Sequence, residues 1–177
     1  MPNYDGFSER EKGFLTQAFA QMRVASAKAR AALLGGNLTA YRKWFEANGT
    51  TQVMKVGSIV KEVDDAILGR PITFAKLDRP GVNVKTSGLC AYVWMLRSGQ
   101  FTHHVGSGMR ILVVWKTHAG EDASYLSETM YHELTHKVGS TTDVVYDRDQ
   151  CLQLAKDRPQ DAARNAENYN RFLSEFF

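Results

Sequence analysis

The chain has 177 residues, of which 44% are hydrophobic and 23% are charged, and its formal net charge is +3. These values are typical of one folded domain over residues 1–177 and exclude a disordered chain. No block of like charges marks a nucleic-acid-binding surface, and no apolar run of about 18 residues could span a bilayer. We therefore expect a protein that binds neither nucleic acid nor membrane. Its two cysteines, Cys90 and Cys151, fit no CxxC spacing and are expected to be buried free thiols.

The first part of the chain, residues 8–69, is predicted to be helical. Ser8 and Glu11 have the spacing of a capping box, and apolar residues follow them at helical spacing until a pair of glycines. A short helix is expected to begin at Thr39, and a third helix is expected over residues 52–68. Each apolar stripe is expected to face the core.

The next part, residues 71–117, is predicted to form a small mixed β-sheet. It contains short segments rich in β-branched and aromatic residues, separated by Gly, Pro and Ser. These segments are PITFAKL (71–77), GVNVKT (81–86), LCAYVWML (89–96) and RILVVW (110–115).

Helical spacing returns over residues 122–177. One helix is expected over about 123–138, a second over 148–156, and a last helix is expected to begin at Pro159, a residue favoured at the first position of a helix. The order of helices, sheet and helices indicates one α+β domain.

The sequence HELTH concentrates reactive side chains in five residues. On a helix, residues four apart share a face, so His132 and His136 can direct two imidazoles at one zinc ion at about 2.0–2.1 Å. Glu133 points about 100° away from His132, which places its carboxylate beside a water molecule on such an ion. The motif therefore predicts a zinc site with Glu133 as the candidate general base.

Catalytic zinc usually has three protein ligands, and the sequence leaves alternatives for the third. Thr142 stands where HExxHxxGxxH would require a histidine, which excludes that arrangement. Asp143 is the nearer candidate, because Gly139 can end the helix and reverse the chain. Glu167, on a later helix, is the alternative. Tyr146 offers a hydroxyl that could donate to the oxyanion formed on an attacked carbonyl.

HELTH followed by STTDVVY resembles the aspzincin metallopeptidases, the group of deuterolysin and the fungal peptidyl-Lys metalloendopeptidase. AYRKWF and LAKDRPQDAARNAENYNRF are similar to other segments of that family. The resemblance implies a single zincin-like domain, mainly helical, with a small mixed β-sheet and an HExxH active-site helix. It also implies one Zn²⁺ per chain on His132, His136 and Asp143, with Glu133 as general base and Tyr146 as transition-state stabiliser.

The resemblance also bears on substrate choice. Lys-selective members line the pocket for the residue after the cut with acidic side chains; Glu167 matches one such position, whereas Asn170 stands where a second acid is expected. An endopeptidase with a weakened preference for Lys is therefore implied. Ser140 departs from the family, which usually has Gly there. We also expect Ile111 and Val113 to lie on an edge strand that pairs with an extended substrate.

We expect a monomer that acts on protein or peptide substrates. The first residues lack a secretory signal, and secretion or export by another route, for instance as a bacterial toxin or effector domain, is favoured over a cytoplasmic location. Two alternatives stay open. One is a catalytically silent binding module of the same shape, against which the intact Glu133 and Tyr146 argue. The other is a peptidase with Glu167 as third zinc ligand.

Overall fold

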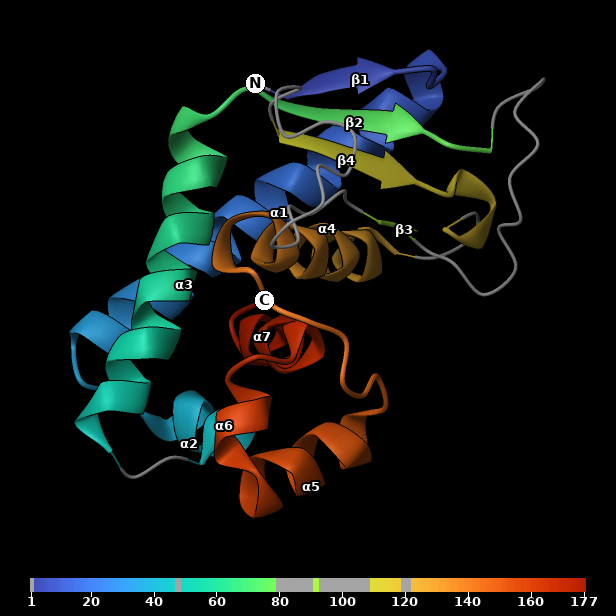
Figure 1. The fold of residues 1–177 in the computed structure, drawn as a ribbon. Coiled ribbons are helices and arrows are strands. Elements are labelled where there is room, and N and C mark those ends of the chain that lie inside the picture. Colours follow the sequence, from blue (N-terminus) through green and yellow to red (C-terminus); the bar gives the residue numbers. More distant parts are fainter. Residues whose placement is uncertain (1, 47–48, 79–90, 93–108, 119–121) are drawn as a thin grey trace, which may run out of the picture.

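The computed structural model describes residues 2–46, 49–78, 91–92, 109–118 and 122–177. A small sheet lies on one side of a layer of long helices, and the shorter helices gather on the other side (Figure 1). Within the described residues, no helix has both the length and the apolar character needed to cross a membrane. The elements are β1 (Asn3–Asp5), α1 (Glu9–Leu34), α2 (Thr39–Phe45), α3 (Thr50–Gly69), β2 (Ile72–Lys76), β3 (Ala91–Tyr92), β4 (Met109–Val113), a 3₁₀ turn (Trp115–Thr117), α4 (Ala123–Gly139), α5 (Arg148–Asp157), α6 (Pro159–Ala162) and α7 (Ala166–Ser174).

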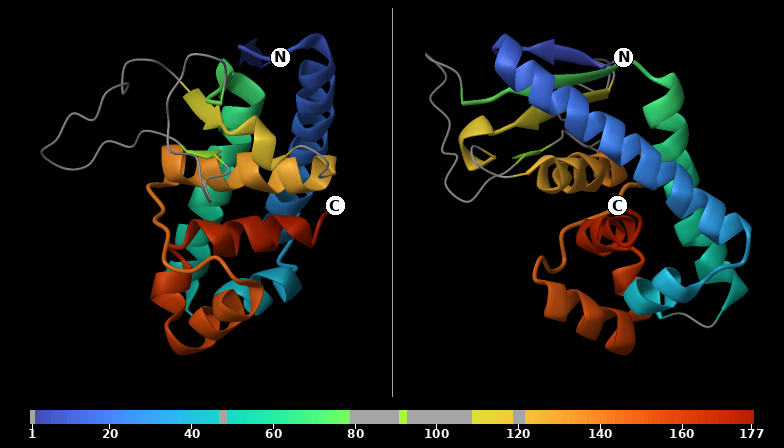
Figure 2. Two further views of the ribbon diagram at one scale, coloured as in Figure 1. Left: turned by 90° about the vertical axis from the view of Figure 1, so that its right-hand side faces the viewer. Right: turned by 180° about the vertical axis from the view of Figure 1, so that it is seen from behind.

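Helices α1 and α3 confirm the predicted helical part of the chain. The capping box at the start of α1 is formed: the Ser8 hydroxyl accepts from the Glu11 amide at 3.4 Å, and the Glu11 carboxylate accepts from the Ser8 amide at 2.7 Å. Both helices bury one apolar stripe against α4, so the three helices share the main core (Figure 2). Burial of these side chains, at roughly 1.5–3 kcal/mol each for the larger ones, holds α4 in place. The buried apolar residues of α1 and α3 are Leu15, Ala18, Met22, Ala25, Ala29, Val56, Ile59, Val60, Val63, Ala66 and Ile67.

The sheet is mixed, with strand order β1-β2-β4-β3. Strands β1, β2 and β4 are parallel, and β3 pairs antiparallel with β4. The sequence did not predict β1, because three residues without alternating apolar side chains carry no strand signal. The predicted segment GVNVKT, most of LCAYVWML and Cys90 lie outside the described residues.

The expectation that Ile111 and Val113 lie on an edge strand is wrong. Strand β4 lies between β2 and β3, and its Ile111 and Val113 side chains are buried in the core. An apolar run of this kind fits an inner strand as well as an edge strand. The apolar residues indicate that the strand is buried, but they do not indicate whether it has one or two neighbouring strands in the sheet. The strand also ends at Val113, and Trp115–Thr117 forms the 3₁₀ turn.

The single last helix that the sequence predicts from Pro159 is divided into α6 and α7. Between them, the Arg164 carbonyl accepts from the Thr142 amide at 2.7 Å, and the Ala166 amide donates to the Thr142 carbonyl at 3.0 Å. The backbone at this point bonds to the loop after α4, so it cannot continue helical hydrogen bonds. The break therefore has a tertiary cause.

Candidate metal centre

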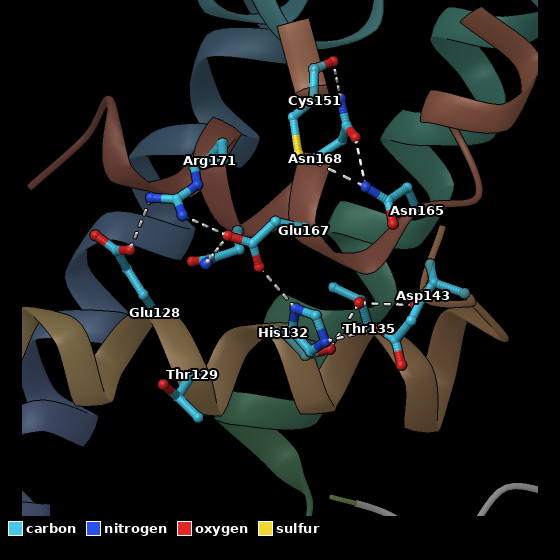
Figure 3. A network of polar contacts seen from close by, with 12 residues as sticks. Glu128, Thr129, His132, Thr135, Asp143, Cys151, Asn165, Glu167, Asn168 and Arg171 are labelled. Atoms are coloured by element: carbon cyan, nitrogen blue, oxygen red, sulfur yellow. Dashed lines mark hydrogen bonds and ion pairs between the residues drawn. The ribbon is translucent and has the colours of Figure 1, made fainter. Parts of the chain in front are cut away.

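Helix α4 supplies three of the site residues. It begins at the N-cap Asp122, whose side chain accepts from the Tyr125 amide at 2.8 Å, and it packs between α1, α3 and α7. His132 and His136 are one turn apart, with ring centroids 4.8 Å apart and ring planes nearly perpendicular. Both imidazoles are buried: His132 contacts Glu167 on α7 (Figure 3), and His136 contacts the Thr141 carbonyl in the loop after α4. The helix period therefore brings the two rings together, and packing holds them.

The turn after α4 is made by Ser140 and not by Gly139, the residue that the sequence favours for it. Gly139 is the last helical residue, and Ser140 takes the left-handed conformation with φ 52° and ψ 36°. A Cβ at Gly139 would lie 2.6 Å from Cγ2 of Ile59, so this glycine is needed for close packing of α4 on α3. Ser140 sits where a glycine would carry no strain.

Replacing Ser140 with Gly is expected to stabilise the protein by about 1 kcal/mol, because the left-handed conformation costs an L residue roughly 1–2 kcal/mol. Urea unfolding of the chelator-treated protein measures the difference. Gly139→Ala is the matched control at the neighbouring position, and it is expected to lower stability because its Cβ overlaps Ile59. A Ser140→Gly protein less stable than the parent would contradict this account of the turn.

Asp143 completes a group of three ligand atoms. Nε2 of His132, Nε2 of His136 and Oδ1 of Asp143 lie 3.1 Å from one another on every side. A tetrahedral zinc ion with bonds of about 2.0–2.1 Å separates its ligand atoms by about 3.3 Å, close to this triangle. The Asp143 side chain is 40% exposed, so the group opens toward solvent on the aspartate side. The three residues form a site of the size and shape that zinc requires.

The hydrogen bonds around the rings also fit a cation. Nδ1 of His136 lies 2.9 Å from the Thr141 carbonyl, and Nδ1 of His132 lies 3.1 Å from the Glu167 carboxylate. Both partners only accept, so each neutral ring carries its proton on Nδ1. In that neutral form, which is the form that binds a metal ion, both Nε2 lone pairs face Asp143.

The electrostatics of the group point the same way. Burial lowers the pKa of His132, but the carboxylates of Asp143 and Glu167 outweigh it and raise this pKa to about 10. Burial likewise opposes ionisation of Asp143, yet the two imidazoles hold its pKa far below the usual range. The site therefore favours a positive charge among these three side chains.

Glu133 and Tyr146 border the metal group. Glu133 is buried on α4, and its charge contributes to raising the pKa of both His132 and Tyr146. The Tyr146 ring stacks on the His132 ring, with centroids 6.1 Å apart and 15° between the planes, and the tyrosine is 59% exposed. Burial and the Asp143 carboxylate raise the pKa of its hydroxyl, which stays a donor at neutral pH.

Asn165, the N-cap residue of α7, holds the loop that carries Asp143 and Tyr146. Its Oδ1 accepts from the Val144 amide at 2.9 Å, and its Nδ2 donates to the Val145 carbonyl at 3.0 Å. Together with the backbone bonds of Thr142, these contacts fasten the loop on both sides of Asp143. Sequence reasoning missed Asn165, because the sequence predicted one helix from Pro159 and so placed this asparagine inside it, whereas α7 begins only after Asn165.

The core beneath Asn165 includes Cys151, which is buried and free as predicted. Burial and the neighbouring Glu167 carboxylate raise the pKa of the Cys151 thiol to about 12. The buried thiol therefore stays protonated at neutral pH, and the protonated form is a poor nucleophile and metal ligand.

Glu167 and Asn170, the two residues expected in a substrate pocket, both lie on α7 and are buried. Glu167 meets His132 at Nδ1, the ring nitrogen that faces away from Asp143, and is not among the three converging ligand atoms. Asn170 donates from Nδ2 to the Glu167 carboxylate at 3.2 Å. Both predicted residues are thus in contact with each other, next to the metal group.

This fold is that of a known peptidase. A solved zinc peptidase from Grifola frondosa matches with a TM-score of 0.72 over 96% of this chain and 97% of its own, at 20% sequence identity. No curated protein sequence matches the chain.

The sequence itself gives the family. The family model described as lysine-specific metallo-endopeptidase matches residues 29–174, most of the chain. The chain belongs to the aspzincin family and is a zinc metalloendopeptidase. Its metal is zinc, for which His132, His136 and Asp143 form a fitting site.

Proposed function

We propose that the protein hydrolyses internal peptide bonds with zinc on His132, His136 and Asp143, Glu133 as general base and Tyr146 as oxyanion donor. The observation that carries the proposal is the convergence of the three ligand atoms within 3.1 Å of one another, with Glu133 and Tyr146 at their border. Three protein ligands and an open side are typical of catalytic zinc, whereas structural zinc is closed by four.

Zinc, when bound, would supply Lewis acidity that lowers the pKa of a water molecule well below its value in bulk solvent. Glu133 then accepts the proton of the attacking water and delivers it to the nitrogen of the leaving amine, so the carboxylate is regenerated in each turnover. Glu133 directly follows His132 on α4, so the helix holds its backbone in a set relation to that ligand. Burial at 5% exposure limits competition from bulk water.

Tyr146 acts on the oxygen atom of the carbonyl group whose carbon the water attacks. As the carbonyl oxygen gains negative charge, the phenolic hydroxyl donates a hydrogen bond to it. Stacking on His132 holds the ring near the metal group, and Asn165 holds the backbone just before it. The donor is thereby positioned before substrate binds, which is the condition under which such donors are effective.

Selectivity for lysine, which the family description names, is a separate part of the proposal. Glu167 would receive the lysine, but its carboxylate already bonds His132, Asn170 and Arg171. Asn170 brings no charge. We therefore propose that cleavage is not restricted to bonds before lysine.

A peptide library digested with the zinc-loaded protein tests the proposal, with cleaved bonds mapped by mass spectrometry. We expect cleavage that a chelator abolishes and added zinc restores, at bonds before several residue types. No cleavage in any sample would favour the binding-module alternative. Cleavage confined to bonds before lysine would contradict the proposed breadth.

A monomeric state and a role as an exported toxin or effector domain stay predictions from the sequence.

A further inference from the structure

Next to Nδ1 of His132, the ring nitrogen that faces away from Asp143, lies a row of charged side chains that the proposed reaction does not use. On α4, Glu128 and His132 are one turn apart; on α7, Glu167 and Arg171 are one turn apart. The two pairs face each other where the helices pack (Figure 3). Charged side chains at such a buried contact are costly unless each is paired.

Glu167 has every oxygen engaged. Its Oε2 lies 3.1 Å from Nδ1 of His132, and its Oε1 lies 2.7 Å from Nη2 of Arg171 and 3.2 Å from Nδ2 of Asn170. The side chain is 8% exposed. The guanidinium supplies the positive charge that offsets burying the carboxylate, and it holds that carboxylate in one orientation. Nη1 of Arg171 also lies 3.8 Å from Oε2 of Glu128.

We propose that Glu167 is a positioning residue for the zinc ligand His132, locked in place by Arg171, and not a receptor for a substrate lysine. The inference rests on the proposed function of the site. By accepting from Nδ1, Glu167 keeps the His132 proton on that nitrogen and leaves Nε2 bare toward the metal. A lysine ammonium could reach the carboxylate only by displacing Arg171.

The arrangement has a consequence for affinity. Partners that accept from the outer nitrogen of a ligating histidine fix its ring and raise its basicity, and their loss typically weakens metal binding about 10- to 100-fold. The dissociation constant of the Glu167→Ala protein for zinc should therefore be about 10- to 100-fold higher than that of the parent. Glu167→Gln should recover most of this loss, because its amide oxygen still accepts from Nδ1.

Metal affinity of the chelator-stripped protein, measured by competition with a chromophoric chelator for Zn²⁺ and by the visible spectrum of bound Co²⁺, tests the proposal. Asp143→Ala is the comparison for loss of a ligand and should bind more weakly than Glu167→Ala. Glu175→Gln is the matched control at the C-cap of α7: its carboxylate pairs with Lys43 at 2.6 Å and accepts from the Trp44 indole at 3.1 Å, so zinc affinity should not change. These measurements do not depend on whether the parent cleaves peptides.

Two results would overturn the proposal. One is a Glu167→Ala protein with parental zinc affinity and a selective loss of cleavage before lysine, which would make Glu167 a substrate residue. The other is a loss equal to that of Asp143→Ala which Glu167→Gln fails to recover, which would make Glu167 a ligand. If the alanine variant does not fold, NMR of ¹⁵N-histidine in the zinc-loaded parent decides: His132 should carry its proton on Nδ1, and a proton on Nε2 would overturn the proposal.

Discussion

Glu133→Gln is expected to keep zinc and to lose peptide hydrolysis by about 100- to 10,000-fold, the range that a positioned general base contributes. The amide has the shape of the carboxylate but cannot accept a proton at neutral pH. The three ligand atoms belong to other residues, so metal affinity should be unchanged. Zinc content by atomic absorption and kcat/KM on a fluorogenic peptide check the two halves of this expectation.

A matched control separates catalysis from folding. Glu128 is a second carboxylate on α4, five residues earlier, and its partner is Arg171 instead of the metal group. Glu128→Gln should leave far more activity than Glu133→Gln. Parental hydrolysis in Glu133→Gln would contradict the general-base role, and loss of zinc from it would show that Glu133 supports the metal.

Tyr146→Phe is expected to lower kcat by about 100- to 1,000-fold, since loss of one oxyanion donor typically costs about 3–4 kcal/mol of transition-state stabilisation. KM and zinc content should change little, because the hydroxyl would act on charge that develops only during the reaction. Thermal stability should also be nearly unchanged, because Tyr146 is 59% exposed and its ring stacking on His132 survives in phenylalanine.

Steady-state kinetics with one peptide substrate measure this split. Tyr4→Phe serves as the control, because it removes a hydroxyl from β1, whose hydrogen bond is to Thr16 on α1. A proportional rise in KM with unchanged kcat in Tyr146→Phe would show that the tyrosine binds substrate and does not act on the transition state.

Local sequence signals carried much of the fold. The capping box at Ser8 begins α1 as predicted, and apolar residues at helical spacing identify α3 and α4, because a helix that packs on a core must bury one stripe. The same spacing rule puts His132 and His136 on one face, so two of the three metal ligands can be read from HELTH alone.

The sequence did not predict those features that depend on residues close in space but distant along the chain. The N-terminal strand β1 is too short to show alternation and forms because β2 lies beside it. The position of β4 inside the sheet depends on β3, which contributes only two described residues. The break between α6 and α7 depends on Thr142, a residue from the loop after α4. In each case a partner far along the chain decides the conformation.

The position of Asp143 depends both on local sequence spacing and on contacts with residues distant along the chain. Its spacing after HELTH made it the nearer candidate for third ligand, but the three residues between the end of α4 at Gly139 and Asp143 can follow many paths. Ser140 in the left-handed conformation turns the chain, and Asn165 then fixes the loop by hydrogen bonds to Val144 and Val145. The carboxylate arrives 3.1 Å from both imidazoles because α7 packs against α4.

The sequence by itself thus determined which reactive groups are available to the site: the imidazoles of His132 and His136 one helical turn apart, the Glu133 carboxylate beside them, and Asp143 and Tyr146 shortly after the helix. Periodicity and spacing suffice there, because a helix has fixed geometry. Only the tertiary structure decided which carboxylate meets which nitrogen of His132, with Asp143 at Nε2 and Glu167 at Nδ1. That choice depends on how α7 docks on α4, and docking results from the packing of the whole core, which no local pattern contains.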